Sequence, residues 1–280
     1  MQIIPVNEPL LPGRELEYIT DCITTGWISS AGKYIDRFEN EWADYCGRKY
    51  GVAVCNGTVA LELALSTLDI PAGREVILPS FTIVSCLEAV LRNGLIPVLV
   101  DCDSRTYCMD IADVRRKITS QTFGADERFR HEDRGWNYRM TNLQAAMGCA
   151  QLERIEQFLS RKLDMANRYN EGLRNLPLQL THVESWAKTS VWMYAVVLED
   201  SVPFDAIEFA GRLMVLGVQT RPFFMGMHEQ PVYQNMGFFQ DDRFQVTERI
   251  YQRGLYLPSG QAITDEQIEQ VISCVHCTLA

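Results

Sequence analysis

The strongest constraint on the fold of this chain is an alternation of apolar runs and helical patterns between residues 51 and 103. GVAVC, EVILP and IPVLVDCD are apolar runs of strand length, the first through Val52 and Val54, and ALELALSTL and SFTIVSCLEAVLRNG between them have helical patterns. Strands that are joined by helices and are apolar along their whole length are typical of a parallel sheet covered on both faces. The sequence therefore predicts an α/β fold.

This alternation stops after a short predicted helix at 110–118. The chain then reads KITSQTFGADERF from residue 117 onward, and no strand pattern follows directly. One long helical pattern instead runs from Thr141 to about Leu173, and two amphipathic helices, at 14–25 and 36–46, precede the sheet. We therefore expect a sheet domain that is followed directly by helical structure.

A smaller α+β unit is predicted from about residue 176 onward. VWMYAVVLE and GVQTRPFF are its strand candidates, FDAIEFAGRLMVLG is a helix between them, and Thr264 with Gln267 forms a capping box for a last helix. We expect the aromatic residues from Trp186 to Tyr194 to lie in its core. The predicted division is 1–122 for the first part of a large domain, 123–175 for a loop and a long connecting helix, and 176–280 for the small domain.

Composition excludes some partners. A formal net charge of −10 and a pI near 5.0 argue against nucleic acid or an anionic membrane as partner, because such surfaces are normally met by clustered Lys and Arg. No apolar run is long enough to span a bilayer, and the first residues lack the pattern of a signal peptide, so we expect a cytoplasmic protein. The nine scattered cysteines fit small buried hydrophobes in a reducing compartment.

Two groups of residues have a spacing that invites comparison with metal sites. Cys274 and Cys277 lie in the last predicted helix without a second Cys/His pair nearby. Asp101 and Asp103 follow a strand, with Asp110 before a helix, where acidic residues commonly serve as solvated loops and caps. We predict no metal site.

Asn56-Gly57-Thr58 is the first candidate for a binding site. It lies where an apolar run leads into a helix, so backbone N–H groups and the Thr58 hydroxyl are at the positive end of the helix dipole, which suits a phosphate. An Asn-Gly turn with Thr58 as helix cap explains the same residues, and spacing alone favours this structural interpretation.

Several motifs in order resemble one known family. GWISSAGKYIDRFE, VAVCNGTVALELAL, ILPSFTIVSCLEAVLRNGLIPVLVDCD, GWNYRMTNLQAAMGCAQLERI and GLYLPSG together cover nearly the whole chain. They are similar to the DegT/DnrJ/EryC1/StrS family of sugar aminotransferases, and most to its perosamine-synthetase-like members. The resemblance implies a fold-type-I α/β architecture with a smaller α+β domain, pyridoxal 5′-phosphate (PLP) as cofactor, a 4-keto nucleotide sugar as substrate and glutamate as amino donor.

The resemblance also assigns site residues. It implies that Gly57 and Thr58 hold the cofactor phosphate, that Asn137 reaches the phosphate of a dimer partner with Arg139 close by, and that Ile83 packs on the pyridine ring. It further implies that the sugar nucleotide is bordered by the loop 27–32, with Trp27, Ser29 and Ser30, and by Arg221 and His228 of the small domain.

One segment of the family is missing from this chain. The family continues beyond the equivalent of KITSQT into further strands, one ending in an Asp that contacts the pyridine nitrogen, and into a loop with the Lys that binds the cofactor as an imine. Here Thr122 is followed directly by Phe123. The remaining lysines (Lys33, Lys49, Lys117, Lys162 and Lys188) have acidic or polar neighbours that indicate surface positions, so no catalytic residue is predicted.

Three interpretations remain open. The chain is an aminotransferase by family that does not complete the reaction alone, a non-catalytic dimer partner of a full-length homologue, or a non-functional remnant. The missing strands would leave sheet edges uncovered, so we expect a protein of low stability or one that depends on oligomerisation, as a homodimer or as a heterodimer with that homologue.

Overall fold

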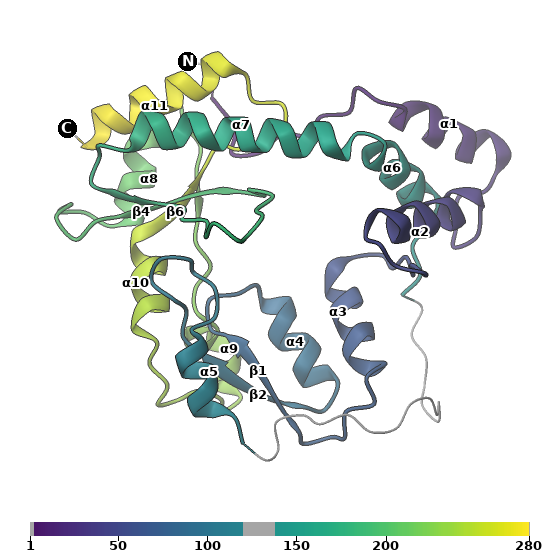
Figure 1. Cartoon of the computed structure of the whole chain (residues 1–280), viewed down its shortest axis with the longest axis horizontal. Coiled ribbons are helices and arrows are strands. Elements are labelled where there is room, and N and C mark those ends of the chain that lie inside the picture. Colours follow the sequence, from purple (N-terminus) through teal and green to yellow (C-terminus); the bar gives the residue numbers. More distant parts are fainter. Residues whose placement is uncertain (1–2, 120–137, 280) are drawn as a thin grey trace.

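The first sheet consists of two parallel strands in the first half of the chain (Figure 1). The computed structural model describes residues 3–119 and 138–279. Strand β1, Glu75–Pro79, pairs with β2, Ile96–Val100, in a register that places Ile77 opposite Val98. The predicted strands EVILP and IPVLV are therefore confirmed as the parallel pair of an α/β unit.

Three helices accompany this sheet. They are α3 (Gly57–Ser66), α4 (Val84–Arg92) and α5 (Ile111–Lys117). Helix α4 joins β1 to β2 and ends before Gly94, whose φ of 68° is readily adopted by glycine, as the C-terminal glycine of the pattern predicted. Leu78, Leu87 and Leu99 form a buried cluster with Met227 and Phe244 from the second half of the chain. The small sheet is thus covered by its own helix and by the distant C-terminal region.

The prediction of a strand through Val52 and Val54 is wrong. Val54 forms only an isolated antiparallel bridge with Arg139, and the Val52 side chain is exposed. A strand persists only where neighbouring backbone pairs with it along its length. Because only the short stretch 138–140 lies beside it in the described part of the chain, this apolar run stays irregular.

Helices α1 (Glu15–Thr25), α2 (Lys33–Tyr45) and α6 (Asn142–Leu152) form a second region. Tyr18, Ile35 and Ala146 are among the buried residues that hold it together. The single long helix predicted from Thr141 to Leu173 is wrong in one respect, because it breaks at Glu153 and Arg154 into α6 and α7 (Ile155–Leu173). The break follows from packing, since α6 contacts α1 and α2 whereas α7 covers the C-terminal domain.

The C-terminal domain contains a four-stranded antiparallel sheet of order β3-β4-β6-β5. Its strands are β3 (Leu178–Leu180), β4 (Tyr194–Leu198), β5 (Arg221–Pro222) and β6 (Gly254–Leu257). Helices α7, α8 (Ala206–Val215) and α11 (Asp265–Leu279) pack with this sheet around a large buried core, and the predicted capping box of Thr264 and Gln267 is present. The α+β character of this region is therefore confirmed.

Two expectations for this domain fail. The strand predicted over GVQTRPFF is only two residues long, because it pairs with β6 for just Arg221 and Pro222. Trp186 and Trp192 are 85% and 61% exposed, so of the aromatic residues between Trp186 and Tyr194 only Tyr194 belongs to the core. The tryptophans lie on the connection between β3 and β4, where no layer covers them.

Two further segments connect the C-terminal domain to the first sheet. The 3₁₀ helix η1 (Met227–Glu229) leads into α9 (Pro231–Asn235), and α10 (Gln245–Arg253) leads into β6. Met227 and Phe244 from these segments pack against the sheet of β1 and β2. This region is therefore the junction of the two halves.

The N-terminal residues belong spatially to the C-terminal domain (Figure 1). Ile4 is buried in the core of that domain, donates its N–H to Gly217 O at 2.8 Å and forms a parallel bridge with Val218. Val6 O accepts a hydrogen bond from Ser259 N at 3.0 Å. The first residues thus add a short edge to a domain whose other strands all come after residue 177.

The surface has two features that bear on partners. Within residues 3–119 and 138–279, no helix combines the length and the apolar character that crossing a bilayer requires.

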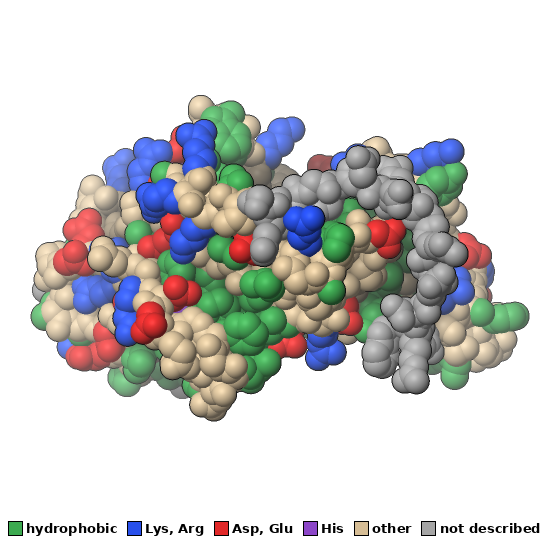
Figure 2. All heavy atoms as spheres, turned by 90° about the horizontal axis from the view of Figure 1, so that it is seen from below, with side chains coloured by type: hydrophobic (Ala, Val, Ile, Leu, Met, Phe, Trp, Pro, Cys, Tyr) green, Lys and Arg blue, Asp and Glu red, His purple; other side chains and the backbone are tan. Residues whose placement is uncertain are grey.

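Seen from below the view of Figure 1, hydrophobic side chains gather in the middle of the exposed face between charged ones (Figure 2).

Candidate functional site

The N-termini of α3 and α4 meet at one corner of the first domain. Asn56 caps α3 through its side-chain oxygen, which accepts from Val59 N at 3.0 Å, so Asn56 rather than Thr58 is the cap. The Thr58 hydroxyl is free from that task and lies 2.8 Å from the Ser85 hydroxyl at the start of α4. Gly57, Thr58 and Ser85 therefore bring together two hydroxyls and the first turns of two helices.

This corner is suited to an anion. The N–H groups that open a helix have no partner within it, and they lie at the positive end of the helix dipole. A side chain placed on Gly57 would meet nothing within 4 Å, so the space beside the α3 backbone is open. Ile83, the residue before α4, is 49% exposed and provides an apolar surface next to Ser85.

The segment 138–142 connects this corner with the loop 27–32. Tyr138 O accepts from Cys55 N at 2.9 Å, and Arg139 forms the bridge to Val54, so its backbone lies beside the residues that lead into α3. Three positions further, Asn142 begins α6 and is only 1% exposed. The predicted site residue Asn137 lies outside the described residues, and so does the junction of Thr122 and Phe123.

Asn142 holds the loop 27–32 in place. Its side-chain Nδ2 donates to Trp27 O at 2.8 Å, its Oδ1 accepts from Tyr34 N at 2.9 Å, and its backbone N–H donates to Ser29 O at 2.7 Å. Gly32 has φ +146°, and a Cβ there would lie 2.4 Å from Asn142 Cγ, so only glycine allows this approach.

A cavity of about 520 Å³ lies beside this loop. Trp27, Gly32, Lys33 and Asn142 line it together with Asp21, Thr25 and Asp36. Trp27 is 58% exposed, and the lining carries charges of both signs. The cavity therefore has the polar groups and the aromatic surface that a sugar nucleotide would need.

The two residues predicted from the small domain have other contacts in the described structure. Arg221 is exposed in β5 opposite Tyr256, and His228 is 1% exposed between Ser80 and Glu248. Across the described segments, no hydrogen bond or ion pair joins Arg221 or His228 to the Gly57–Thr58 corner or to the loop 27–32. The structure thus brings together Gly57, Thr58, Ile83 and Arg139, with Trp27, Ser29 and Ser30 on the adjoining loop.

Comparison with known proteins identifies the family. The model of the DegT/DnrJ/EryC1/StrS aminotransferase family matches residues 10–125 and 121–276. This chain belongs to that family. The two matched segments meet at 121–125, where the sequence predicts that a segment is missing.

Relatives of the DegT/DnrJ/EryC1/StrS family align over nearly the full chain. GDP-perosamine synthases from Vibrio cholerae and Escherichia coli O157:H7 are 29% and 27% identical, covering 98% and 99% of this chain and 98% of each relative. The alignment with the Vibrio protein is 362 positions long and this chain has 280 residues, so at least 82 positions have no residue here. That excess agrees with the predicted internal gap.

Solved structures show the same fold. The aminotransferase TlmJ from Streptoalloteichus hindustanus superposes with a TM-score of 0.86 at 22% identity, covering 99% of both chains. The PLP form of the sugar aminotransferase Spr1654 from Streptococcus pneumoniae gives 0.85 at 17% identity, covering 98% of this chain and 100% of that one. The fold is therefore the fold-type-I α/β fold of the family, and PLP is the cofactor that membership implies.

The residues present fit only part of PLP. The corner of Gly57, Thr58 and Ser85 suits its phosphate, but four of the five lysines have contacts elsewhere. Lys33 pairs with Asp21, Lys49 lies over the Tyr50 ring, Lys117 donates to Leu99 O and Lys162 donates to Trp192 O. Covalent attachment of PLP requires an amine beside its aldehyde, and the contacts of these four amines direct them away from the corner of Gly57 and Thr58.

Lys162 differs from its predicted surface position. Its Nζ donates to the carbonyls of Trp192 and Ser259, and its side chain is partly buried. Burial lowers the pKa of this amine. Its two carbonyl partners connect α7 with the start of β4 and with the loop after β6, which is a structural role within the C-terminal domain.

Sequence reasoning missed two residues of this candidate site. Ser85 is 27 positions from Thr58, and Asn142 is 115 positions from Trp27. Ser85 lies within the helix predicted over SFTIVSCLEAVLRNG and is the second residue of α4, and Asn142 directly follows the capping residue Thr141. These positions were the available signals, but neither specifies a contact partner.

Proposed function

We propose that this chain is a nucleotide-sugar aminotransferase of the perosamine-synthase type that retains the phosphate-binding part of the site but does not complete amino transfer by itself. Its relatives named GDP-perosamine synthase motivate the substrate class, a 4-keto nucleotide sugar with glutamate as donor. PLP, when bound, would supply the electron-accepting ring for such a reaction. In this chain Gly57, Thr58 and Ser85 would bind the phosphate, and Ile83 would pack against the ring.

One observation carries this proposal. The two hydroxyls of Thr58 and Ser85 lie 2.8 Å apart at adjoining helix N-termini, beside open space, whereas the contacts of Lys33, Lys117 and Lys162 direct their amines to other parts of the fold. Phosphate binding needs the first arrangement, and imine formation needs an amine at the same place. The site therefore supports binding without covalent attachment.

Borohydride treatment of the full chain with PLP is expected to leave no reduced adduct. A PLP imine absorbs differently from the free aldehyde, and reduction fixes it irreversibly to the lysine. Absorbance spectra followed by intact mass and peptide mapping would measure this. An adduct mapped to a single lysine would contradict the proposal, and a full-length relative treated in parallel is the positive control.

Equilibrium binding of the cofactor tests whether the corner of Gly57, Thr58 and Ser85 binds phosphate. Pyridoxal 5′-phosphate should bind more tightly than pyridoxal, and Thr58→Val and Ser85→Ala, made separately, should each weaken its binding roughly 10- to 100-fold, because a hydrogen bond to a charged group contributes about 1.5–3 kcal/mol. Thr67→Val is the matched control, since its hydroxyl only donates to Ala64 O at the other end of α3. Equal binding by all variants would show that the Thr58 and Ser85 hydroxyls do not bind the phosphate.

A second candidate function is that of a dimer partner for a full-length homologue. It is favoured by exposed large apolar side chains on α1, α2 and the loop between them, among them Leu16, Ile23, Trp27, Ile28 and Trp42. Single exposed apolar residues are common, but a group on adjoining elements marks an interaction surface.

Co-expression with a full-length relative is expected to give a heterodimer on size exclusion. Ile23→Glu with Trp42→Glu should return this chain to its uncomplexed elution volume, because buried carboxylates oppose association. The matched change Ile207→Glu, on the exposed face of α8, should leave the complex intact. A complex that persists with Ile23→Glu and Trp42→Glu would show that this surface is not the heterodimer interface.

A further inference from the structure

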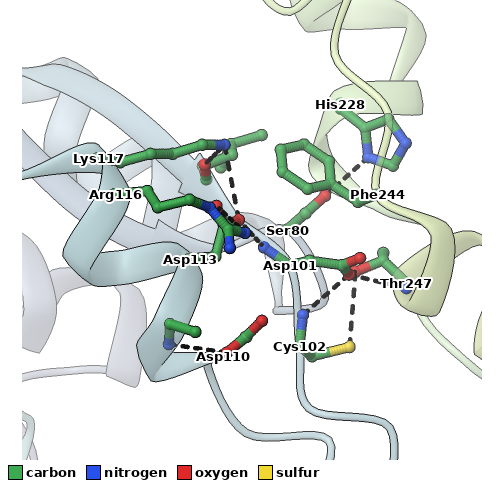
Figure 3. A network of polar contacts seen from close by, with 12 residues as sticks. Ser80, Asp101, Cys102, Asp110, Asp113, Arg116, Lys117, His228, Phe244 and Thr247 are labelled. Carbon is green, nitrogen blue, oxygen red and sulfur yellow. Dashed lines mark hydrogen bonds and ion pairs between the residues drawn. The ribbon is translucent and has the colours of Figure 1, made fainter.

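His228 occupies the carboxyl end of β1, where the C-terminal domain meets the first sheet (Figure 3). Its Nδ1 lies 2.7 Å from the hydroxyl of Ser80, the residue that follows β1, and its Nε2 lies 3.2 Å from Glu248 Oε1. Ser80 is fully buried and His228 is 1% exposed. Both ring nitrogens are therefore engaged by groups of the protein itself.

The surroundings fix the ring in this position. Phe244 packs edge-on against it with ring centroids 4.9 Å apart, and a side chain on Gly226 would lie 2.6 Å from His228 Cε1. The charged groups on this side are Glu248, Glu229 and Arg243, which line a polar cavity of about 350 Å³ together with His228 and Gln234. His228 thus has one direction of contact toward the first domain, and that contact is Ser80.

Ser80 belongs to the turn that starts α4. Its carbonyl accepts from Met227 N at 3.0 Å and from Thr82 N at 3.1 Å, and its own N–H donates to Val100 O at 2.8 Å. Thr82 in turn donates its hydroxyl to Cys86 Sγ at 3.3 Å. The residues 227–228 therefore hold the turn 80–83 from the side of the C-terminal domain.

The same turn sets the position of the phosphate corner. Ile83 is the residue before α4, and Ser85, two positions later, bonds to Thr58 at the start of α3. A shift of the turn moves the first turn of α4, and with it the Ser85 hydroxyl. A path thus runs from His228 to Ser80 by a hydrogen bond, along the backbone of the turn to Ser85, and from Ser85 to Thr58 by a second hydrogen bond.

We propose that His228 is a positioning residue that couples the C-terminal domain to the phosphate corner. It acts through the Ser80 hydroxyl and touches neither phosphate nor sugar. Only the expected effect on the affinity for pyridoxal 5′-phosphate rests on the proposed function. The coupling itself is a property of the ligand-free chain.

Hydrogen exchange of the ligand-free full chain, resolved by segment, tests the coupling. His228→Ala and Ser80→Ala are each expected to speed exchange roughly five- to tenfold in the first turns of α4 and of α3, since each removes the buried hydrogen bond between Ser80 and His228 that restrains them. Ser80→Ala cuts the same contact without altering the C-terminal domain, so it serves where His228→Ala fails to fold. His228→Asn, whose amide offers a polar atom near the position of Nδ1, is expected to restore slow exchange.

The pattern of exchange separates coupling from a purely local role. Faster exchange confined to β1 and residues 226–235, with α3 unchanged, would overturn the inference. His276→Ala is the matched control, because this exposed histidine only contacts Gly172 O. In the binding arm, pyridoxal 5′-phosphate should bind at least about fivefold more weakly to Ser80→Ala than to the unaltered chain. If the unaltered chain does not bind it, the proposed function fails, whereas the exchange pattern still decides the coupling.

Discussion

Asp101→Ala is expected to lower the free energy of unfolding by about 3 kcal/mol, because it removes the charged acceptor for four donors. The Asp101 carboxylate accepts from Thr247 N at 3.0 Å, Thr247 Oγ1 at 2.8 Å, Val246 N at 3.1 Å and Cys102 N at 2.8 Å (Figure 3). It follows β2 directly and satisfies the first turn of α10, so it joins the two halves of the molecule. Alanine would leave these donors without acceptors at a partly buried junction.

Urea denaturation with a matched control measures this effect. Asp110→Ala makes the same chemical change at the start of α5, where the side chain accepts only from Ala112 N at 2.8 Å, and should cost about 1 kcal/mol. The expected result is a clearly larger loss for Asp101→Ala. Equal losses for both variants would mean that the contact between the domains adds nothing beyond an ordinary helix cap.

Arg253→Met is expected to cost about 3 kcal/mol as well, through a different loss. The Arg253 guanidinium donates to four backbone carbonyls and to no carboxylate in the described structure, at Leu198, Glu199, Val202 and Phe204. These carbonyls belong to the end of β4 and the loop before α8, and three of the four residues are buried. Methionine keeps the apolar stem but leaves the carbonyls without donors.

The Arg253→Lys variant sharpens the test, because one ammonium cannot reproduce the planar fork of a guanidinium. It should recover less than half of the loss in thermal or urea denaturation. Arg92→Met is the control, since Arg92 is exposed and pairs only with Glu88 at 3.3 Å, so the change should stay within about 0.5 kcal/mol. Full stability of Arg253→Lys would show that charge alone, and not the fork, fixes the loop.

Elements that depend on local pattern could be predicted from the sequence. β1, β2 and α4 have complete signals within their own residues, and so does the capping box of Thr264. The strand at 52–54 could not be predicted correctly, because a strand depends on neighbouring backbone, and within residues 3–119 and 138–279 only the stretch 138–140 lies beside it. The break between α6 and α7 is also non-local, since the apolar periodicity continues across it while the two helices face different cores.

The candidate site divides in the same way. Gly57 and Thr58 were assigned to the cofactor phosphate by the family resemblance, because their strand-turn-helix pattern alone fits an ordinary helix start equally well. Ser85 and Asn142 were missed because their contacts join positions far apart in the chain. His228 was expected beside the substrate, and its burial against Ser80 depends on the docking of two domains. The division at 122 and 175 and the role of Asn137 stay predictions.

The position of Ile4 has a consequence for how this chain comes off the ribosome. Its partners Gly217 and Val218 are synthesised more than two hundred residues later, so Ile4 stays exposed until these residues have been synthesised. Domains generally form in the order of synthesis, but this core combines Ile4 with residues that follow it by more than two hundred positions. Until Ile4 is inserted, the edge of that core at Val218 stays open to other chains.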